Sequence, residues 1–214
     1  MNKEEKIRRI EKFLRFNYDA GIEGALNHPA KEIVSDYKQR VSNIPYSFYI
    51  NSADLHYFIC RQLYYKYIGE YAYFCAHQCV ENYLKAMIKF IGLIPPNIHH
   101  LADLVEITRK NTNVDTCPFI HSEELQMISS LYEPYYEFAR YPVQNIRPKD
   151  GKYAMFYPDG IKVLDLFVYR MRETIAIPKR SQDSFSEVHP NLRLCAYSFP
   201  SFYNQFKSDN INFE

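Results

Sequence analysis

The sequence has few glycines and no glycine-rich motif. Only 6 of its 214 residues are glycine, and they stand apart. The G-x-G-x-x-G pattern of dinucleotide-binding folds and the GxxxxGKS/T pattern of P-loop proteins both need closely spaced glycines, which let backbone N–H groups approach a phosphate. The sequence therefore excludes the usual phosphate-cradling loops, and we expect no cofactor.

Long apolar runs are also missing. No stretch of eighteen consecutive apolar residues occurs, whereas a membrane-spanning helix needs about 20. The N-terminal residues MNKEEKIRRIEKF are charged and lack the apolar core of a signal peptide. The 5 cysteines are odd in number and fall mainly in apolar helical patterns, which favours reduced thiols. We expect a cytoplasmic protein with no membrane partner.

The chain has no excess of charge of either sign. Its formal net charge is +1, so no global field attracts nucleic acid or an anionic membrane. The helix predicted over residues 3–16 is rich in lysine and arginine, but Glu4, Glu5 and Glu11 alternate with them. This pattern favours a solvated face over a nucleic-acid-binding face. RNA binding would have to come from a local patch.

Tryptophan is absent, whereas tyrosine is abundant. The chain contains 20 tyrosines and an aromatic fraction of 16%. A tyrosine ring is large and apolar but its hydroxyl needs a partner, so tyrosine is frequent at interfaces and at half-buried positions. The tyrosines therefore agree with a homodimer, and half-exposed core positions explain them nearly as well.

The stretch from Gly69 to Leu104 organises the rest of the chain. Its apolar residues recur with the i, i+3, i+4, i+7 spacing of a helix that buries a broad stripe. Glu81 and Lys85 fall on the opposite, polar side in the favourable order for a helical ion pair. Gly92 is the expected C-terminal cap, and Pro95-Pro96 prevents the helix from continuing. The predicted buried residues are Ala72, Cys75, Ala76, Cys79, Val80, Tyr83, Leu84, Met87 and Ile91.

Helical spacing recurs elsewhere, and strand alternation is nowhere sustained. We expect further helices over 52–67 with Ser52 as N-cap, from His99, from the N-cap Ser122, and over 161–175. The helix over 52–67 is expected to bury Leu55, Phe58, Ile59 and Leu63. These helices predict an all-α, antiparallel up-and-down bundle of four or five helices.

Three regions are expected along the chain. A helical extension covers residues 1–45, with a boundary at Asn43-Ile44-Pro45. The bundle covers residues 46–176. The tail over residues 177–214 is polar and rich in Ser, Asn and Pro, and we expect it to be mostly irregular, with a few aromatic residues that could dock it.

The chain offers few residues with the spacing of a metal or catalytic site. Cys75 and Cys79 share a helical face, but no second Cys/His pair joins them, so we expect buried thiols and no metal. His77 is expected at the surface. His99 and His100 begin a helix after a proline turn, where a structural role is favoured. No nucleophile–histidine arrangement can be named from spacing.

One polar cluster follows the fifth predicted helix. It contains Arg140, Tyr141, Asn145 and Arg147, with Lys149 close behind. A guanidinium at a helix end beside a proline-fixed turn is suited to bind a phosphate or a carboxylate. The other interpretation is an arginine that caps a helix C-terminus and a solvated loop. The residues favour the two interpretations equally.

Several of these residues resemble the HEPN family of α-helical bundles. The stretch Ala76–Ala86 is similar to the family's A-x-Q-x-x-E-x-x-LK-A helix. Gly92, Pro96, His99, Leu101 and Leu104 resemble the following G…P-x-x-H-x-L-x-x-L segment, and Arg140-Tyr141-Pro142 matches a frequent R-Y-P. The helix from Ile161 matches the closing helix. The resemblance covers residues 50–175.

The resemblance implies specific functions. Many HEPN proteins are metal-independent ribonucleases, often toxins paired with a nucleotidyltransferase antitoxin. Their site is an arginine, four to six residues and then a histidine, assembled across a dimer interface. Arg140 matches the arginine, but Asn145, Ile146 and Arg147 stand where the histidine would, and Tyr141 replaces a small polar residue. Because an amide has no titratable proton near neutral pH, Asn145 cannot act as general base.

Three hypotheses follow. The favoured one is a dimeric HEPN-like module that binds a nucleotide, RNA or a protein partner such as a nucleotidyltransferase, without nuclease activity. Arg140, Tyr141, Asn145 and Arg147 would form its ligand site. The first alternative is a toxin-type or defence ribonuclease that uses Arg140 and an unexpected base, for which His99, His100 and His121 are candidates. The second is a structural dimeric adaptor.

Overall fold

The computed structural model divides the chain into two units, Met1–Ile44 and Pro45–Glu214. It describes residues 41–66, 69–136, 160–175, 200–208 and 210–213, together with Glu5, Arg9 and Lys12. The first unit is described at those three residues, which are helical, and at residues 41–44. Most of the expected N-terminal helix therefore lies outside the described residues. Everything that follows concerns the second unit.

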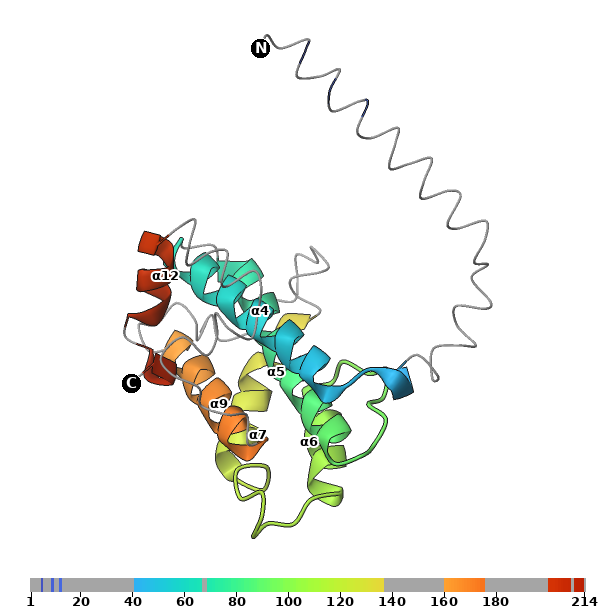
Figure 1. The fold of residues 1–214 in the computed structure, drawn as a ribbon. Helices are drawn as coiled ribbons and strands as arrows, with labels where there is room; N and C mark the ends of the chain where they lie inside the picture. The colour runs from blue at the N-terminus through green and yellow to red at the C-terminus, as the bar shows by residue number, and fades with distance from the viewer. Residues whose placement is uncertain are drawn as a thin grey trace. The chain divides into compact units, whose positions relative to one another are not determined.

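The second unit is a bundle of helices (Figure 1). The helices are α4 Tyr46–Tyr65, α5 Gly69–Phe90, α6 Leu101–Lys110, α7 Glu123–Tyr132, α9 Gly160–Thr174 and α12 Pro200–Lys207, followed by the 3-10 helix η2 Ile211–Phe213. No described residue lies in a strand. The predicted all-α fold is confirmed. Within the described ranges no helix is both long and apolar enough to cross a membrane.

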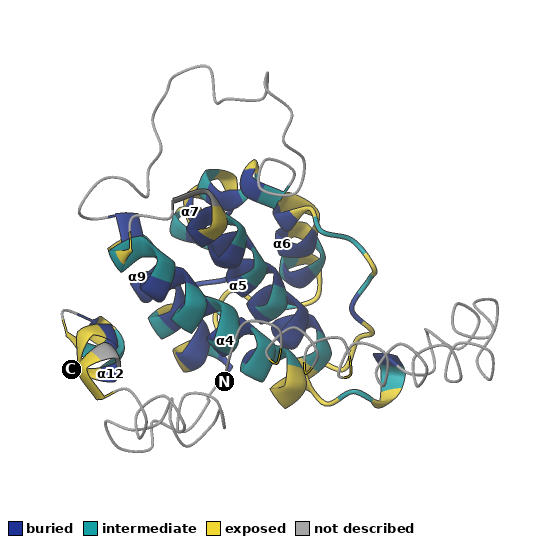
Figure 2. Ribbon diagram, turned by 90° about the horizontal axis from the view of Figure 1, so that it is seen from above, coloured by how far each residue is buried: buried dark blue, intermediate teal, exposed yellow. Residues whose placement is uncertain are grey.

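Helix α5 lies in the middle of the bundle and contacts α4, α6, α7 and α9 (Figure 2). The apolar stripe predicted from Ala72 to Met87 is buried, as expected. However, Glu81 and Lys85 are only 3% and 8% exposed. The polar side on which they were predicted is therefore covered as well, because α4, α6, α7 and α9 all contact the central helix. Their ion pair forms, with 2.7 Å between Lys85 Nζ and Glu81 Oε1.

The ends of the helices follow from local sequence, with one exception. Gly92 has a φ of +86°. The bonds from Leu93 N to Ile88 O (3.1 Å) and from Gly92 N to Lys89 O (3.0 Å) close a Schellman motif. Ser122 Oγ accepts a bond from Leu125 N at 3.2 Å, so the predicted N-cap of α7 is confirmed.

The expected N-cap at Ser52 is wrong. Helix α4 begins at Tyr46, and Pro45, with a φ of −70°, occupies the N-cap position without a side-chain cap bond. The carbonyl oxygen of Pro45 accepts from Phe48 N at 3.0 Å, so the first turn of α4 closes on the backbone of Pro45 without a polar side chain. Ser52 therefore lies inside α4 and not at its start.

The buried side of α4 also differs from the expectation. Leu55, Phe58, Ile59 and Leu63 are only half-buried. The fully buried side carries Ala53, Cys60 and a set of polar residues that includes Asp54, Tyr57 and Arg61. Asp54, Tyr57 and Arg61 can be buried because each has a hydrogen-bond partner on another helix.

Two closed polar networks join α4 to α9. In the first, Asp54 pairs with Arg172 and also accepts from Tyr83 of α5, while Arg172 Nε donates to the Tyr83 hydroxyl at 3.0 Å. In the second, Arg61 forms an ion pair with Asp165, with 2.6 Å between Arg61 Nη1 and Asp165 Oδ2. Burial disfavours the charge of Arg61 and Arg172, but their acidic and phenolic partners outweigh it and raise the pKa of both.

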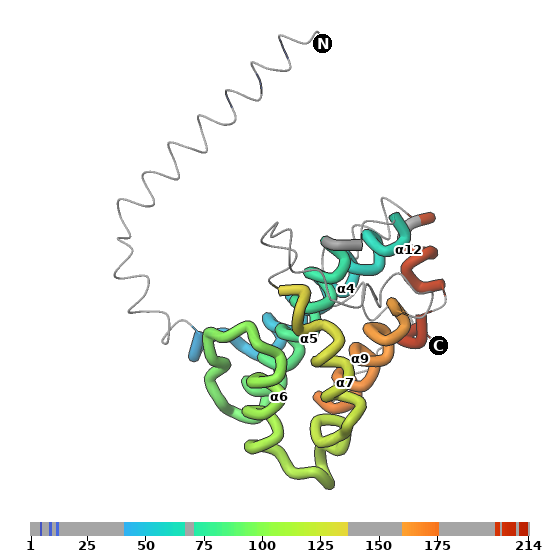
Figure 3. The backbone as a smooth tube through the Cα atoms, turned by 180° about the vertical axis from the view of Figure 1, so that it is seen from behind, coloured from blue at the N-terminus to red at the C-terminus, as the bar shows by residue number. Residues whose placement is uncertain are grey.

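The C-terminal residues pack on the second network. Helix α12 contacts α4 (Figure 3), and the buried Phe206 ring lies 5.5 Å from the ring of Tyr57. Tyr57 donates to Asn210 Oδ1 at 3.0 Å, and Asn212 Nδ2 donates to the Tyr57 hydroxyl at 3.2 Å. The tail was expected to be mostly irregular. Its residues 177–199 lie outside the described residues, and residues 200–207 form a helix.

Candidate functional site

A polar cluster lies on α5 opposite the segment that leads into α6. His77, Glu81 and Lys85 are spaced four residues apart, so the helix brings them to one face. The Schellman turn at Gly92 and Pro95-Pro96 reverse the chain and return His99 to Glu81. We call His77, Glu81, Lys85 and His99 the Glu81 cluster.

The Glu81 carboxylate is the centre of this cluster. Its Oε1 accepts from Lys85 Nζ at 2.7 Å and contacts His99 Nδ1 at 3.0 Å. Its Oε2 accepts from Gln78 Nε2 at 2.9 Å and lies 3.5 Å from His77 Nε2. Burial on its own would raise the pKa of Glu81, but the contacts with His77, Lys85 and His99 outweigh it and hold the pKa at about 2. Glu81 is therefore ionised throughout the physiological range.

His77 is fully buried, so the expectation of a surface residue is wrong. Its Nδ1 lies 3.1 Å from Tyr132 O and its Nε2 lies 3.1 Å from His99 O. Since a carbonyl oxygen only accepts, a neutral imidazole satisfies one of these contacts. His77 thereby ties α5 to the end of α7 and to the segment before α6. Its role is to hold these elements around Glu81.

His99 forms the open edge of the cluster. Its side chain is 41% exposed. Its ring stacks on Tyr136, with 4.5 Å between centroids and 15° between planes. Because the carboxylate of Glu81 only accepts, Nδ1 of His99 carries the proton of that contact. Within the described part of the chain, no hydrogen bond is formed by the other ring nitrogen, Nε2.

The other histidines named as candidate bases are held differently. His100 Nδ1 lies 3.0 Å from Glu133 Oε1, and that carboxylate also accepts from the first backbone N–H groups of α6. His121 Nε2 lies 3.1 Å from Thr112 Oγ1 and 3.2 Å from Thr112 O. Neither has a buried carboxylate behind it, as His99 does.

The cysteines of α5 are buried thiols, as predicted. Burial raises the pKa of Cys75 to about 12 and that of Cys79 well above its usual value. In the described ranges, no group of three or more His, Cys, Asp or Glu side chains is arranged to hold a metal ion.

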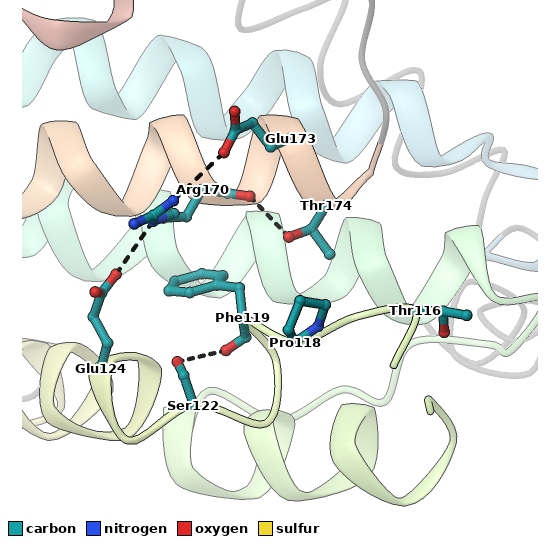
Figure 4. A pocket seen from close by; sticks show the side chains of 8 residues that line it. All are labelled: Thr116, Pro118, Phe119, Ser122, Glu124, Arg170, Glu173 and Thr174. Atoms are coloured by element: carbon teal, nitrogen blue, oxygen red, sulfur yellow. Dashed lines mark hydrogen bonds and ion pairs between the residues drawn. The ribbon is translucent and has the colours of Figure 1, made fainter. Parts of the chain in front are cut away.

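A cavity of about 380 Å³ lies elsewhere, between α7, α9 and the loop before α7 (Figure 4). Arg170 lies at this cavity between two carboxylates. Its Nε is 3.7 Å from Glu124 Oε1, and its Nη1 is 3.7 Å from Glu173 Oε2. Two carboxylates thus surround one guanidinium, and the local charge is unfavourable for a phosphate. This cavity is therefore not our candidate site.

The predicted ligand residues Arg140, Tyr141, Asn145 and Arg147 lie outside the described residues. The described segment 69–136 ends at Tyr136, four residues before Arg140, and the Tyr136 ring stacks on His99. The Glu81–His99 pair was not predicted from the sequence. The available signal was the spacing of His77, Glu81 and Lys85 on one helical face followed by a histidine after a proline turn.

Comparison with known proteins gives one match. The model of the HEPN domain matches residues 48–161, which is more than half of the chain. The match begins in α4, covers α5, α6 and α7, and ends at the start of α9. No curated protein and no solved structure matches the chain. The chain therefore belongs to the HEPN domain family, which suggests an RNA-binding or nuclease-type module.

Proposed function

We propose that this HEPN domain binds RNA at the open edge of the Glu81 cluster, with Arg140, Tyr141, Asn145 and Arg147 as further ligand residues. The observation that supports this proposal is the exposed His99 ring stacked on Tyr136. Arg140 follows Tyr136 by four residues, and four residues of chain span at most about 14 Å. The basic motif and His99 are therefore within reach of one RNA segment of a few nucleotides.

The charges of the cluster are compatible with a phosphate backbone. Lys85 neutralises Glu81, so the pair presents no net negative charge beneath His99. Arg140, Arg147 and Lys149 add positive charge in the segment that follows Tyr136. Arginine forms paired bonds to phosphate oxygens, which makes it the group expected to contribute most to affinity.

Binding and cleavage are separate questions for this chain. Asn145 can hydrogen bond a ribose hydroxyl but cannot take its proton, so the Arg140–Asn145 motif supports binding without turnover. RNA binding is the function that remains whether or not another group supplies a base. A nucleotidyltransferase partner is compatible with this function and stays a proposal.

The binding test uses fluorescence anisotropy with a labelled 12-nucleotide single-stranded RNA. We expect binding that weakens steeply with salt, because phosphate contacts release counterions. Arg140→Ala should weaken binding about tenfold or more, the loss of roughly one charge-assisted hydrogen bond. Arg170→Ala is the matched control, since Arg170 is an exposed arginine already paired with Glu124 and Glu173.

The outcomes separate the hypotheses. Weak, salt-independent binding, or equal losses in Arg140→Ala and Arg170→Ala, would contradict the proposal and favour the structural adaptor. HEPN domains often dimerise, and we propose that this one is a homodimer. Sedimentation equilibrium at tens of micromolar checks this, and a monomer would contradict it.

A further inference from the structure

We propose that the surface of α4 and α9 around Tyr57 and Arg61 is a peptide-recognition site, and that the chain's own C-terminal residues occupy it as a separable ligand. These residues are 200–208 and 210–213, which we call the C-terminal segment. They lie beyond the match to the HEPN domain, which ends at residue 161. The inference does not depend on RNA binding.

The first argument is an aromatic anchor. Phe206 of α12 is 0% exposed. Its ring packs edge-to-face on two rings of α4, with 5.5 Å between its centroid and that of Tyr57 and 5.2 Å to that of Phe58. The guanidinium carbon of Arg61 lies 5.7 Å from the centroid of the Phe206 ring, within the range of a cation–π contact. Because a few buried anchors usually supply most of the binding energy of an interface, we expect Phe206 to be the main anchor here.

The second argument is a set of specific hydrogen bonds beside this anchor. Asn210 is 1% exposed, and its Oδ1 lies 3.0 Å from the Tyr57 hydroxyl. Asn212 Nδ2 donates to the main-chain oxygen of Asp165 on α9 at 3.1 Å. A buried polar group that loses its partner is costly, so these bonds favour an asparagine at both positions. The recognised pattern is therefore a phenylalanine followed by asparagines four and six residues later.

Asn210 also shapes the segment itself. Its Nδ2 donates to Phe206 O at 3.2 Å, and its Oδ1 accepts from Asn212 N at 3.1 Å. An aspartate could accept the second bond but could not donate the first. Helix α12 has 8 residues and η2 has 3, and helices of this length are not stable on their own in water. We therefore expect the segment to become helical as it docks.

The third argument is that the recognition site is complete without the segment. Arg61 pairs with Asp165 at 2.6 Å and also donates to the Tyr65 hydroxyl at 2.6 Å. The Tyr57 hydroxyl has one proton, and the Asp165 carboxylate accepts it. Release of the segment would therefore leave no charged group of the site without a partner, whereas loss of α9 would isolate Arg61. The segment is bound as a ligand is bound to a preformed site.

The test measures binding of a labelled synthetic peptide, with the sequence of residues 198–214, to the full chain. In the wild-type protein the linked segment competes at an effective concentration of about 1 mM, so the peptide should bind weakly. Phe206→Ala in the full chain weakens the protein's own segment, and this variant should bind the wild-type peptide about tenfold more tightly or better. Fluorescence anisotropy measures both affinities, and urea unfolding of the same samples checks the fold.

Matched variants locate the contact. In the peptide, Phe206→Ala should lower the affinity about thirtyfold or more, and Asn210→Ala about tenfold. Gln205→Ala is the control peptide and should keep the affinity, because Gln205 is exposed on α12. In the full chain, Phe58→Ala added to Phe206→Ala should remove most of the gain, since the half-buried Phe58 ring contacts the Phe206 ring. A substitution that only destabilised the protein would not raise its affinity for the peptide.

Each outcome decides the inference. Tighter peptide binding by the folded Phe206→Ala variant, reversed by Phe58→Ala, supports it. Equal affinities of this variant and the wild type overturn it, because the peptide would then bind elsewhere. Absence of binding to the folded variant overturns it as well. Loss of the cooperative unfolding transition in Phe206→Ala also overturns it, because the segment would then be part of the core. None of these outcomes affects the proposed RNA binding.

Discussion

Two charged networks of this bundle share helix α5 and differ in their access to solvent. Asp54, Tyr83 and Arg172 form the closed network, in which the two charged side chains are 0% and 8% exposed. Glu81, Lys85 and His99 form the open one, in which Glu81 is 4% and His99 41% exposed. Both combine a buried carboxylate with several donors. Only in the second is one side chain, that of His99, open to solvent over a large part of its surface.

The difference separates a structural role from the ligand-binding role that we propose. In the closed network each group is surrounded by protein, and its hydrogen bonds and ion pair join α4, α5 and α9. A buried ion pair gives little net stability over apolar residues, but removing one partner is costly. In the open network the buried Glu81 carboxylate contacts the His99 ring and thereby orients it. Substitutions in each network, together with changes of pH and salt, test this contrast.

Asp54→Ala should destabilise the protein by about 3–5 kcal/mol, because it leaves the Arg172 guanidinium buried without its carboxylate. Urea unfolding measures the loss. The control is the triple variant Asp54→Leu, Tyr83→Phe, Arg172→Met, in which no charge remains, and it should recover most of the loss. A similar deficit in both variants would show that shape, and not charge, is decisive at this position.

Acid should weaken the open network over a defined pH range. The pKa of Glu81 is lowered from 4.5 to about 2 on folding. A lowered pKa gives stability that is fully present above the unfolded value and is lost as pH falls from about 4.5 to about 2. The shift corresponds to about 3 kcal/mol. The stability difference between wild type and Glu81→Gln, measured in urea at pH 6 and pH 3, should therefore shrink at pH 3.

A difference between wild type and Glu81→Gln that is equal at both pH values would contradict this prediction. It would mean that the carboxylate of Glu81 is not held in its charged form by folding. The comparison with Glu81→Gln is needed because acid affects the other carboxylates of the chain as well.

Local signals predicted the helices and several of their ends. The stripe from Ala72 to Met87, the turn at Gly92 and the cap at Ser122 depend on neighbours a few residues away, so the sequence determines them directly. Burial depends on the number of helices around each face. Periodicity identifies a polar face of α5, but it does not show that α6 and the preceding segment cover that face.

The candidate site was also not predictable from local sequence, because it depends on packing between distant segments. Glu81 and His99 are eighteen residues apart, and their contact needs both the turn at Gly92 and the packing of α6 on α5. His77 was expected at the surface, yet it lies inside the bundle, where the carbonyl oxygens of Tyr132 and His99 face its two ring nitrogens. On α4, Asp54 and Arg61 are buried for the same reason, since their partners on α9 are more than a hundred residues away.

The carboxylate of Glu133 is more exposed than those of Asp54 and Glu81, so removing its charge should change the stability least. Glu133 follows α7, and its side chain is 29% exposed. Its Oε2 accepts from Leu101 N at 2.7 Å and from Ala102 N at 3.2 Å, so it caps the first turn of α6, and its Oε1 contacts His100. Glu133→Gln keeps an oxygen that can cap these N–H groups and removes the charge. We therefore expect a loss of about 0.3–1 kcal/mol, the usual value for a charge at a helix N-terminus.

Salt distinguishes this exposed charge from the buried ones. At 1 M salt the screening length falls to about 3 Å, so the stability difference between wild type and Glu133→Gln should nearly vanish. The deficit of Asp54→Ala should persist at 1 M salt, because the buried Arg172 is shielded from ions. Urea unfolding at 0.1 M and 1 M salt checks both variants. A salt-independent loss of several kcal/mol in Glu133→Gln would contradict this prediction. It would show that an exposed carboxylate can contribute as much stability as the buried Asp54, so that exposure does not explain the difference between the two networks.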